Sequence, residues 1–133
     1  LEASKRELGD VLYRRARHVV TENRRVTEAA EALSRCDLER LGALMAASHR
    51  SLRRDFEVTT PAIDQLNGLV TAAVGRTGGA RMTGAGFGGA IVAVTTPDRV
   101  ATIEEAVGGW EATGLAGEPE VFVCEAVGGA GEV

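Results

Sequence analysis

The chain has 133 residues, of which 44% are hydrophobic and 26% charged, and its formal net charge is −4. These values are those of one soluble globular domain that can bury a core. Its 15 basic and 19 acidic residues leave no basic excess, which argues against a nucleic-acid-binding protein. No apolar run reaches the length of a membrane span, and no signal peptide opens the chain. The two cysteines, Cys36 and Cys124, lack metal-ligand spacing and indicate free thiols in a reducing cytoplasm.

The N-terminal segment allows two interpretations. An apolar repeat after Ser4 predicts a short opening helix. The residues that follow, Arg14–Val20, alternate like a strand, but their apolar positions also continue the helical spacing into one long helix. Periodicity does not decide between the two. Thr21 is suited to cap a helix that runs to about Leu33.

Two helices with clear start signals follow. Apolar residues at helical spacing predict an amphipathic helix over Asp37–Ser48. Thr60 then precedes Pro61. Threonine is a good helix cap, and proline fits the first helical position because the missing N–H has no intrahelical partner there. This pair predicts a helix over Pro61–Val74.

The C-terminal half predicts strands and one more helix. Ala80–Thr83 is a short strand candidate, and Ala90–Thr96 is a stronger one because it is rich in β-branched residues. Pro97 repeats the signal of threonine followed by proline and starts a helix that should stop before Gly114. Glu120–Val127 is predicted to be a final strand, with Val121, Val123 and Glu125 on one face and Phe122, Cys124 and Ala126 on the other.

A glycine-rich loop separates the first two of these strands. Gly84, Gly86 and Gly89 match the spacing G-x-G-x-x-G, but a dinucleotide site needs a helix after the glycines, and here a strand follows. A P-loop is excluded because the only lysine is Lys5. Two uses remain open. The glycines either allow a wide turn with positive φ, or expose backbone N–H groups to a ligand, which an anion would suit.

The loop and its flanks resemble a known family. Gly79–Gly89, GARMTGAGFGG, is similar to the third signature motif of galactokinases in the GHMP small-molecule kinase superfamily. Arg15–Val26, Asp37–Val58 and Thr113–Ala130 also resemble galactokinase segments, in the same order, so the resemblance covers nearly the whole chain. The stretch SHRSLRRDFEV points to galactokinase rather than to mevalonate or homoserine kinases.

The resemblance implies a fold and a site. It implies that residues 1–133 form one GHMP kinase C-terminal domain, an α+β ferredoxin-like sandwich. Arg14–Val20 would then be the first strand of a four-stranded antiparallel sheet packed against helices. The glycine loop would lie near the sugar and the transferred phosphate, where glycines let the main chain approach the substrates. The substrate-proximal residues implied are Thr83, Gly84, Ala85, Gly86, Phe87, Gly88 and Gly89.

The resemblance also implies an activity, the ATP- and Mg²⁺-dependent phosphorylation of galactose to galactose 1-phosphate. Phosphoryl transfer needs a phosphate cradle, a metal site and a group that orients the attacking hydroxyl. In galactokinases these lie in an N-terminal catalytic domain, and none of their motifs occurs here. Because the chain also does not begin with methionine, we expect a fragment that contributes no catalytic or metal-binding residue and is inactive alone. The alternatives are a stand-alone, non-catalytic ferredoxin-like module that binds a ligand or a protein, and a sugar sensor.

Two residues of the loop raise specific questions. Ala85 stands where the family has glycine. If its φ is positive, the methyl group costs roughly 1–2 kcal/mol of strain, and otherwise it only narrows the approach to a ligand. The aromatic ring of Phe87 is expected to anchor the loop in the core rather than to line a cleft.

Several titratable residues elsewhere favour structural roles. Asp55 and Glu57 follow a helix beside two arginines, and ion pairing is more probable there than acid–base catalysis. His49 and His18 are expected to be hydrogen-bonded structural histidines. Asp64 falls in the first turn of its helix, where the helix dipole favours a carboxylate.

Overall fold

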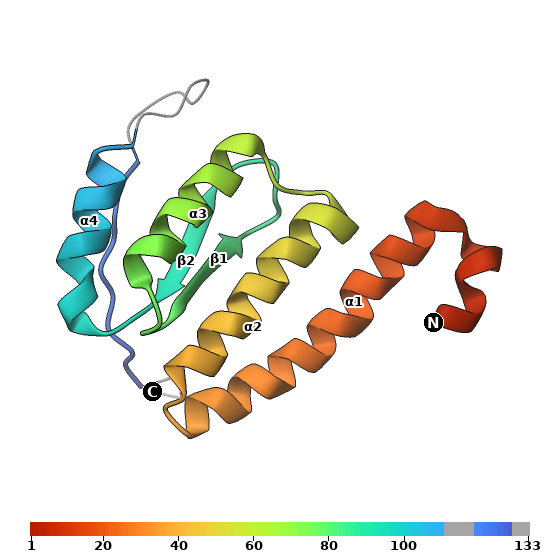
Figure 1. The fold of residues 1–133 in the computed structure, drawn as a ribbon, viewed down its shortest axis with the longest axis horizontal. Helices are drawn as coiled ribbons and strands as arrows, with labels where there is room; N and C mark the ends of the chain where they lie inside the picture. The colour runs from red at the N-terminus through yellow and green to blue at the C-terminus, as the bar shows by residue number, and fades with distance from the viewer. Residues whose placement is uncertain (111–118, 129–133) are drawn as a thin grey trace, which may run out of the picture.

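The structure is a computed structural model that describes residues 1–110 and 119–128, an α+β arrangement in which helices predominate (Figure 1). The described elements are η1 (Glu2–Ser4), α1 (Lys5–Ser34), α2 (Leu38–Ser51), η2 (Leu52–Phe56), α3 (Pro61–Val74), β1 (Gly79–Thr83), β2 (Ala90–Val94), η3 (Pro97–Arg99) and α4 (Val100–Gly108). Gly9 has a φ of 69° and interrupts α1 near its start. The α+β class is confirmed.

The first long helix, α1, contradicts the expected first strand. Arg14–Val20 lies inside α1, and so does Thr21, which was expected to cap a later helix. The buried residues of α1, Tyr13, His18 and Ala32, recur along the helix, which packs against α2 and η2. A helix satisfies its own backbone hydrogen bonds, whereas a strand needs a paired neighbour. Of the two interpretations that periodicity left open, the single long helix is correct.

The next two helices begin where the sequence indicates. The carboxylate of Asp37 accepts a 2.9 Å hydrogen bond from the N–H of Arg40 and caps α2. The hydroxyl of Thr60 accepts a 3.3 Å hydrogen bond from the N–H of Ile63 and caps α3. The bounds of α3 agree with the prediction, while α2 continues three residues beyond Ser48. The last helix, α4, ends at Gly108; Gly114 lies outside the described residues.

Among the described residues the sheet has two antiparallel strands, not the four expected. β1 pairs with β2 from Gly79 opposite Val94 to Thr83 opposite Ala90. The expected final strand, Glu120–Val127, is not assigned as a strand, and its large apolar side chains are exposed. An extended segment becomes a strand only when its N–H and C=O groups pair with a neighbour. This segment makes no such pairing within the described part of the chain.

The helix α2 packs very closely against β1. A Cβ atom added to Gly42 would lie only 1.8 Å from the carbonyl oxygen of Gly78, and one added to Gly79 would lie 2.5 Å from the Cα atom of Gly42. Glycine is therefore needed on both sides of this contact, because any side chain would separate the helix from the strand. α2 also supplies His49, whose Nδ1 accepts a 3.2 Å hydrogen bond from the N–H of Met82 in β1.

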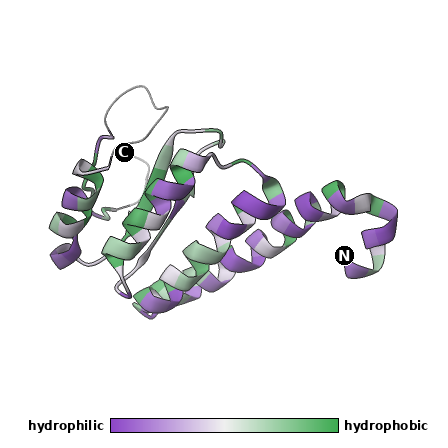
Figure 2. Ribbon diagram, turned by 45° about the horizontal axis from the view of Figure 1, so that its top comes forward, coloured by the Kyte–Doolittle hydropathy of each residue, from purple (hydrophilic) through white to green (hydrophobic). Residues whose placement is uncertain are grey.

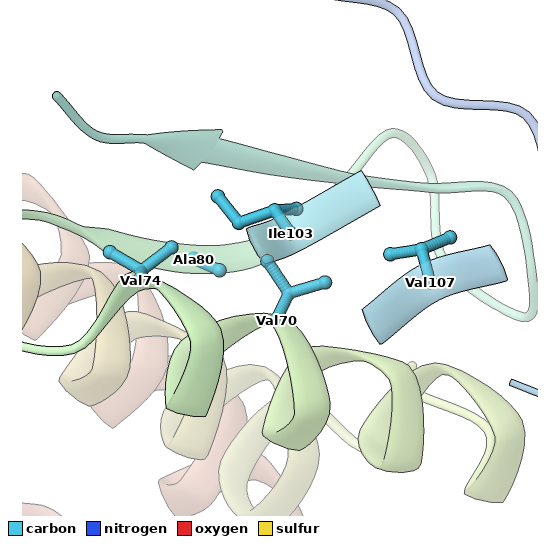
Figure 3. Close-up of a cluster of buried hydrophobic side chains, with 5 residues drawn as sticks. All are labelled: Val70, Val74, Ala80, Ile103 and Val107. Atoms are coloured by element: carbon cyan, nitrogen blue, oxygen red, sulfur yellow. The ribbon is translucent and has the colours of Figure 1, made fainter. Parts of the chain in front are cut away.

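The main hydrophobic core lies between α3, α4 and β1. Figure 3 shows its five buried side chains, Val70, Val74, Ala80, Ile103 and Val107, which converge from these three elements. Burying a side chain of valine or isoleucine size stabilises a fold by roughly 1.5–3 kcal/mol, so this cluster packs the hairpin against α3 and α4.

Figure 2 shows that α1 is mainly hydrophilic. None of the helices in the described part of the chain combines the length and apolar character needed to cross a bilayer.

Candidate functional site

Of the expected site residues, Thr83 ends β1 and Gly84–Gly89 form the loop that leads to β2. Four glycines of this loop, Gly84, Gly86, Gly88 and Gly89, have φ angles between 85° and 136°. Side chains with a Cβ atom rarely adopt such angles. The loop is largely exposed, with Gly86 and Gly88 half-buried. The glycines thus create a backbone surface that other residues would not form.

Ala85 departs from the family motif without backbone strain. It is not among the residues with positive φ, so the strained alternative does not apply. Its side chain is exposed. The methyl group therefore adds bulk to the open surface of the loop.

The loop is fastened through its backbone to Val58. The N–H of Phe87 donates a 2.7 Å hydrogen bond to the carbonyl oxygen of Val58, and a Cβ atom added to Gly86 would lie 2.6 Å from that same oxygen. The expectation that the Phe87 ring anchors the loop in the core is wrong, since this residue is 75% exposed. Its left-handed φ of 61° lets the backbone make the attachment while the ring stays in solvent.

The segment that carries Val58 is tied to α1 by ion pairs. Glu57, in a left-handed conformation after η2, accepts hydrogen bonds from Arg14 at 3.0 Å and from Arg15 at 2.6 Å. Arg17 pairs with Asp55. Ion pairing of the two acids is confirmed, but their partners come from α1 and not from the adjacent arginines. The pairs of Glu57 are partly exposed and each contributes little. Together they fix the direction in which the chain leaves η2.

Asp55, Ser51 and His18 form a buried hydrogen-bonded chain. The Ser51 hydroxyl donates to Asp55 at 2.9 Å, so the Nδ1–H of His18, 3.0 Å away, donates to the serine oxygen. Burial alone would raise the pKa of Asp55, but the hydrogen bonds from Arg17 and Ser51 outweigh it and lower that pKa. A nucleophilic triad needs histidine between serine and aspartate. With serine in the middle the chain is structural, as expected for His18.

His49 links three elements as a neutral side chain. Its Nδ1 accepts the N–H of Met82, so its Nε2–H donates to Asp64 at 3.2 Å. Burial lowers the pKa of His49, and the carboxylate of Asp64 offsets only part of that effect. Arg53 also pairs with Asp64, at 3.0 Å. The hydrogen bonding expected for His49 and the place of Asp64 in the first turn of α3 are confirmed.

The described residues do not supply a metal site near the loop. No group of three or more histidine, cysteine, aspartate or glutamate side chains in the described ranges is arranged to hold a cation. Asp55 and Glu57, the carboxylates on the segment that holds the loop, are already paired with arginines. Mg²⁺ prefers carboxylate and water oxygens, so these residues do not fit the implied Mg²⁺.

Comparison with known proteins defines the class. The family model for the C-terminal domain of GHMP kinases matches residues 29–110, a range that contains α2, both strands, the glycine loop and α4. The chain belongs to the GHMP kinases, a family that uses ATP.

A solved structure makes the comparison more specific. The chain is similar to the galactokinase of Lactococcus lactis, whose structure was determined in complex with galactose. The two are 42% identical with a TM-score of 0.73, and the match covers 80% of this chain but 28% of that galactokinase. The chain is therefore similar to a galactokinase in its C-terminal domain and spans less than a third of that protein's length.

Sequence patterns located the loop but missed what holds it. No sequence motif around Val58 indicates a contact with the loop, and its partner Phe87 is 29 positions away in the sequence. The arginines that bind Glu57 are 42 and 43 positions from it. Only the grouping of basic residues at Arg14 and Arg15, with acids at Asp55 and Glu57, hinted at these contacts.

Proposed function

We propose that residues 1–133 are the C-terminal domain of a galactokinase, which an N-terminal catalytic domain completes. The whole enzyme would transfer the terminal phosphoryl group of ATP to galactose and form galactose 1-phosphate. The observation that carries this proposal is the 42% identity with a galactokinase that binds galactose. The GHMP kinase family supports the use of ATP.

In this proposal the glycine loop, Thr83–Gly89, contributes main chain to the substrate cleft. Four glycines with positive φ and an exposed surface support that role, because exposed N–H groups in such a loop can bind anionic oxygens. The attachment to Val58 supports a loop that is held in place before substrate binds, which lowers the cost of ordering it. The loop positions substrate, and the metal ligands and the group that orients the sugar hydroxyl come from the other domain. The chain alone is therefore inactive.

A substitution at Ala85 tests the role of the loop. In the complete protein, Ala85→Val places two more methyl groups on the exposed surface without requiring positive φ. We expect the KM for galactose or for ATP to rise by about tenfold, the scale of a small steric change in a binding site. Ala43→Val, at an exposed position of α2, is the control and should leave both KM values unchanged. If Ala85→Val has the KM values of the wild type, the proposal that the loop lines the substrate cleft is contradicted.

A further inference from the structure

A hollow of about 260 Å³ lies where α1, the end of α2 and η2 meet. Four arginines line it, Arg17, Arg25, Arg50 and Arg54, against the single carboxylate of Asp55. No residue of the glycine loop contributes to it. The chain as a whole carries a net charge of −4, so this concentration of guanidinium groups is a local feature and does not follow from the composition.

The one carboxylate in the hollow cannot neutralise all four arginines. One oxygen of Asp55 pairs with Arg17, and the other accepts the Ser51 hydroxyl. The low pKa of Asp55, to which these hydrogen bonds contribute against the effect of burial, keeps it ionised and engaged with Arg17. Asp55 therefore orients Arg17 and does not pair with Arg50 or Arg54.

The other arginines have donors to spare. Within the described residues, Arg50 and Arg54 form neither an ion pair nor a side-chain hydrogen bond. Arg25 bonds to Glu22 at 3.2 Å and to Thr21 at 3.0 Å through one nitrogen, while its Nε is buried without a hydrogen-bond partner in the described part of the chain. Arg50 and Arg54 are therefore the two guanidinium groups of the hollow that have no acceptor among the described side chains.

We propose that the hollow binds a phosphoryl-bearing anion, with Arg50 and Arg54 as its principal ligands. The planar guanidinium group donates two parallel hydrogen bonds, which match the oxygens of a phosphate. Arg17 and Arg25, each paired with one carboxylate, complete the guanidinium lining from α1, and Thr21 and Ser51 line the hollow between the two helices. Because the site is built wholly from this chain, it does not depend on the proposed galactokinase activity.

Calorimetric titration of the 133-residue chain with pyrophosphate tests the proposal. We expect saturable binding of one pyrophosphate, and Arg50→Gln/Arg54→Gln should weaken it by about tenfold or more, since two charge-assisted contacts are lost. Both arginines are exposed and unpaired within the described residues, so the fold should survive, and circular dichroism checks this. The control is Arg24→Gln/Arg76→Gln, which removes the same charge from exposed pairs with Glu28 and Glu39 and should bind as wild type.

Three results would overturn the proposal. The first is the absence of saturable pyrophosphate binding, or an equal loss of affinity in both double variants. An equal loss would mean that pyrophosphate responds only to the overall positive charge of the surface. The second is binding of citrate as tight as that of pyrophosphate, which contradicts a phosphoryl ligand. The third is binding of pyrophosphate by the isolated chain but not by the complete protein. That result would mean that an acidic surface elsewhere in the complete protein contacts the arginines of the hollow. Loss of pyrophosphate binding would leave the kinase proposal intact, because that proposal is measured by galactose-dependent turnover.

Discussion

The N–H of Phe87 and the carbonyl oxygen of Val58 are joined by a 2.7 Å hydrogen bond, which connects the glycine loop to the segment after η2. Glu57, next to Val58, is held by Arg14 and Arg15 of α1. The position of the loop is thus set by a path from the hairpin through Val58 to the first helix. A loop fixed in this way presents its backbone in one arrangement, as a binding surface requires.

Substitution of Gly86 tests this attachment. Gly86→Ala should lower the free energy of unfolding by about 2–5 kcal/mol. The left-handed φ accounts for roughly 1–2 kcal/mol, and the clash of the new Cβ with Val58 adds overpacking strain of about 1–3 kcal/mol. Gly88→Ala is the matched control, because Gly88 also has positive φ but has no atom within 4 Å of an added Cβ. Urea denaturation measures both, and equal losses would show that the contact with Val58 has no energetic role.

The contact between α2 and β1 gives a second prediction. Gly42→Ala should destabilise the chain by about 3 kcal/mol or more, because the new Cβ would lie 1.8 Å from the carbonyl oxygen of Gly78 and would force the helix off the strand. Gly68→Ala, in the interior of α3 with nothing within 4 Å, should stabilise it by about 0.5–1 kcal/mol through helix propensity. Thermal or urea unfolding that shifts both variants in the same direction would contradict this packing.

The histidines give a pH-dependent prediction. Burial lowers the pKa of both His18 and His49, so the unfolded chain binds protons more readily, with a pKa near 6.5. Their contribution to stability is complete above about pH 6.5 and is lost as the pH falls toward their folded pKa values. Denaturation curves from pH 7.5 to 5 should therefore show decreasing stability.

His49→Asn isolates one of these contributions. Asparagine can still accept the N–H of Met82 but does not titrate, so this variant should be less stable at pH 7.5 and should show a flatter pH profile. The chain has two histidines in all, and His18→Asn reports the other one. A slope unchanged in both variants would mean that other groups cause the pH dependence.

Local signals in the sequence predicted the parts of the fold that depend on neighbours in the chain. The bounds of α3 follow from Thr60 and Pro61 at its start and Gly75 at its end. The second strand of the hairpin follows from the β-branched residues after the glycine-rich loop. The residues of the candidate loop were predicted to lie together because they are consecutive in the sequence.

Long-range packing decided the parts that the sequence did not predict. Arg14–Val20 has strand-like alternation, but the burial of His18 against Phe56 of η2 and of Ala32 against α2 favours one continuous helix. The ring of Phe87 was expected in the core, and a left-handed backbone placed it in solvent instead. Ala85 shows the same limit, because the sequence allowed either sign of its φ and only the structure excludes a positive one.

A coupled ADP-release assay tests the central proposal most directly. It compares the 133-residue chain with the complete protein that contains it, each with ATP and Mg²⁺, and with or without galactose. The proposal predicts galactose-dependent ADP release by the complete protein and none by the 133-residue chain. Galactose-dependent turnover by the chain alone, or a folded complete protein that releases no ADP in response to galactose, would contradict it.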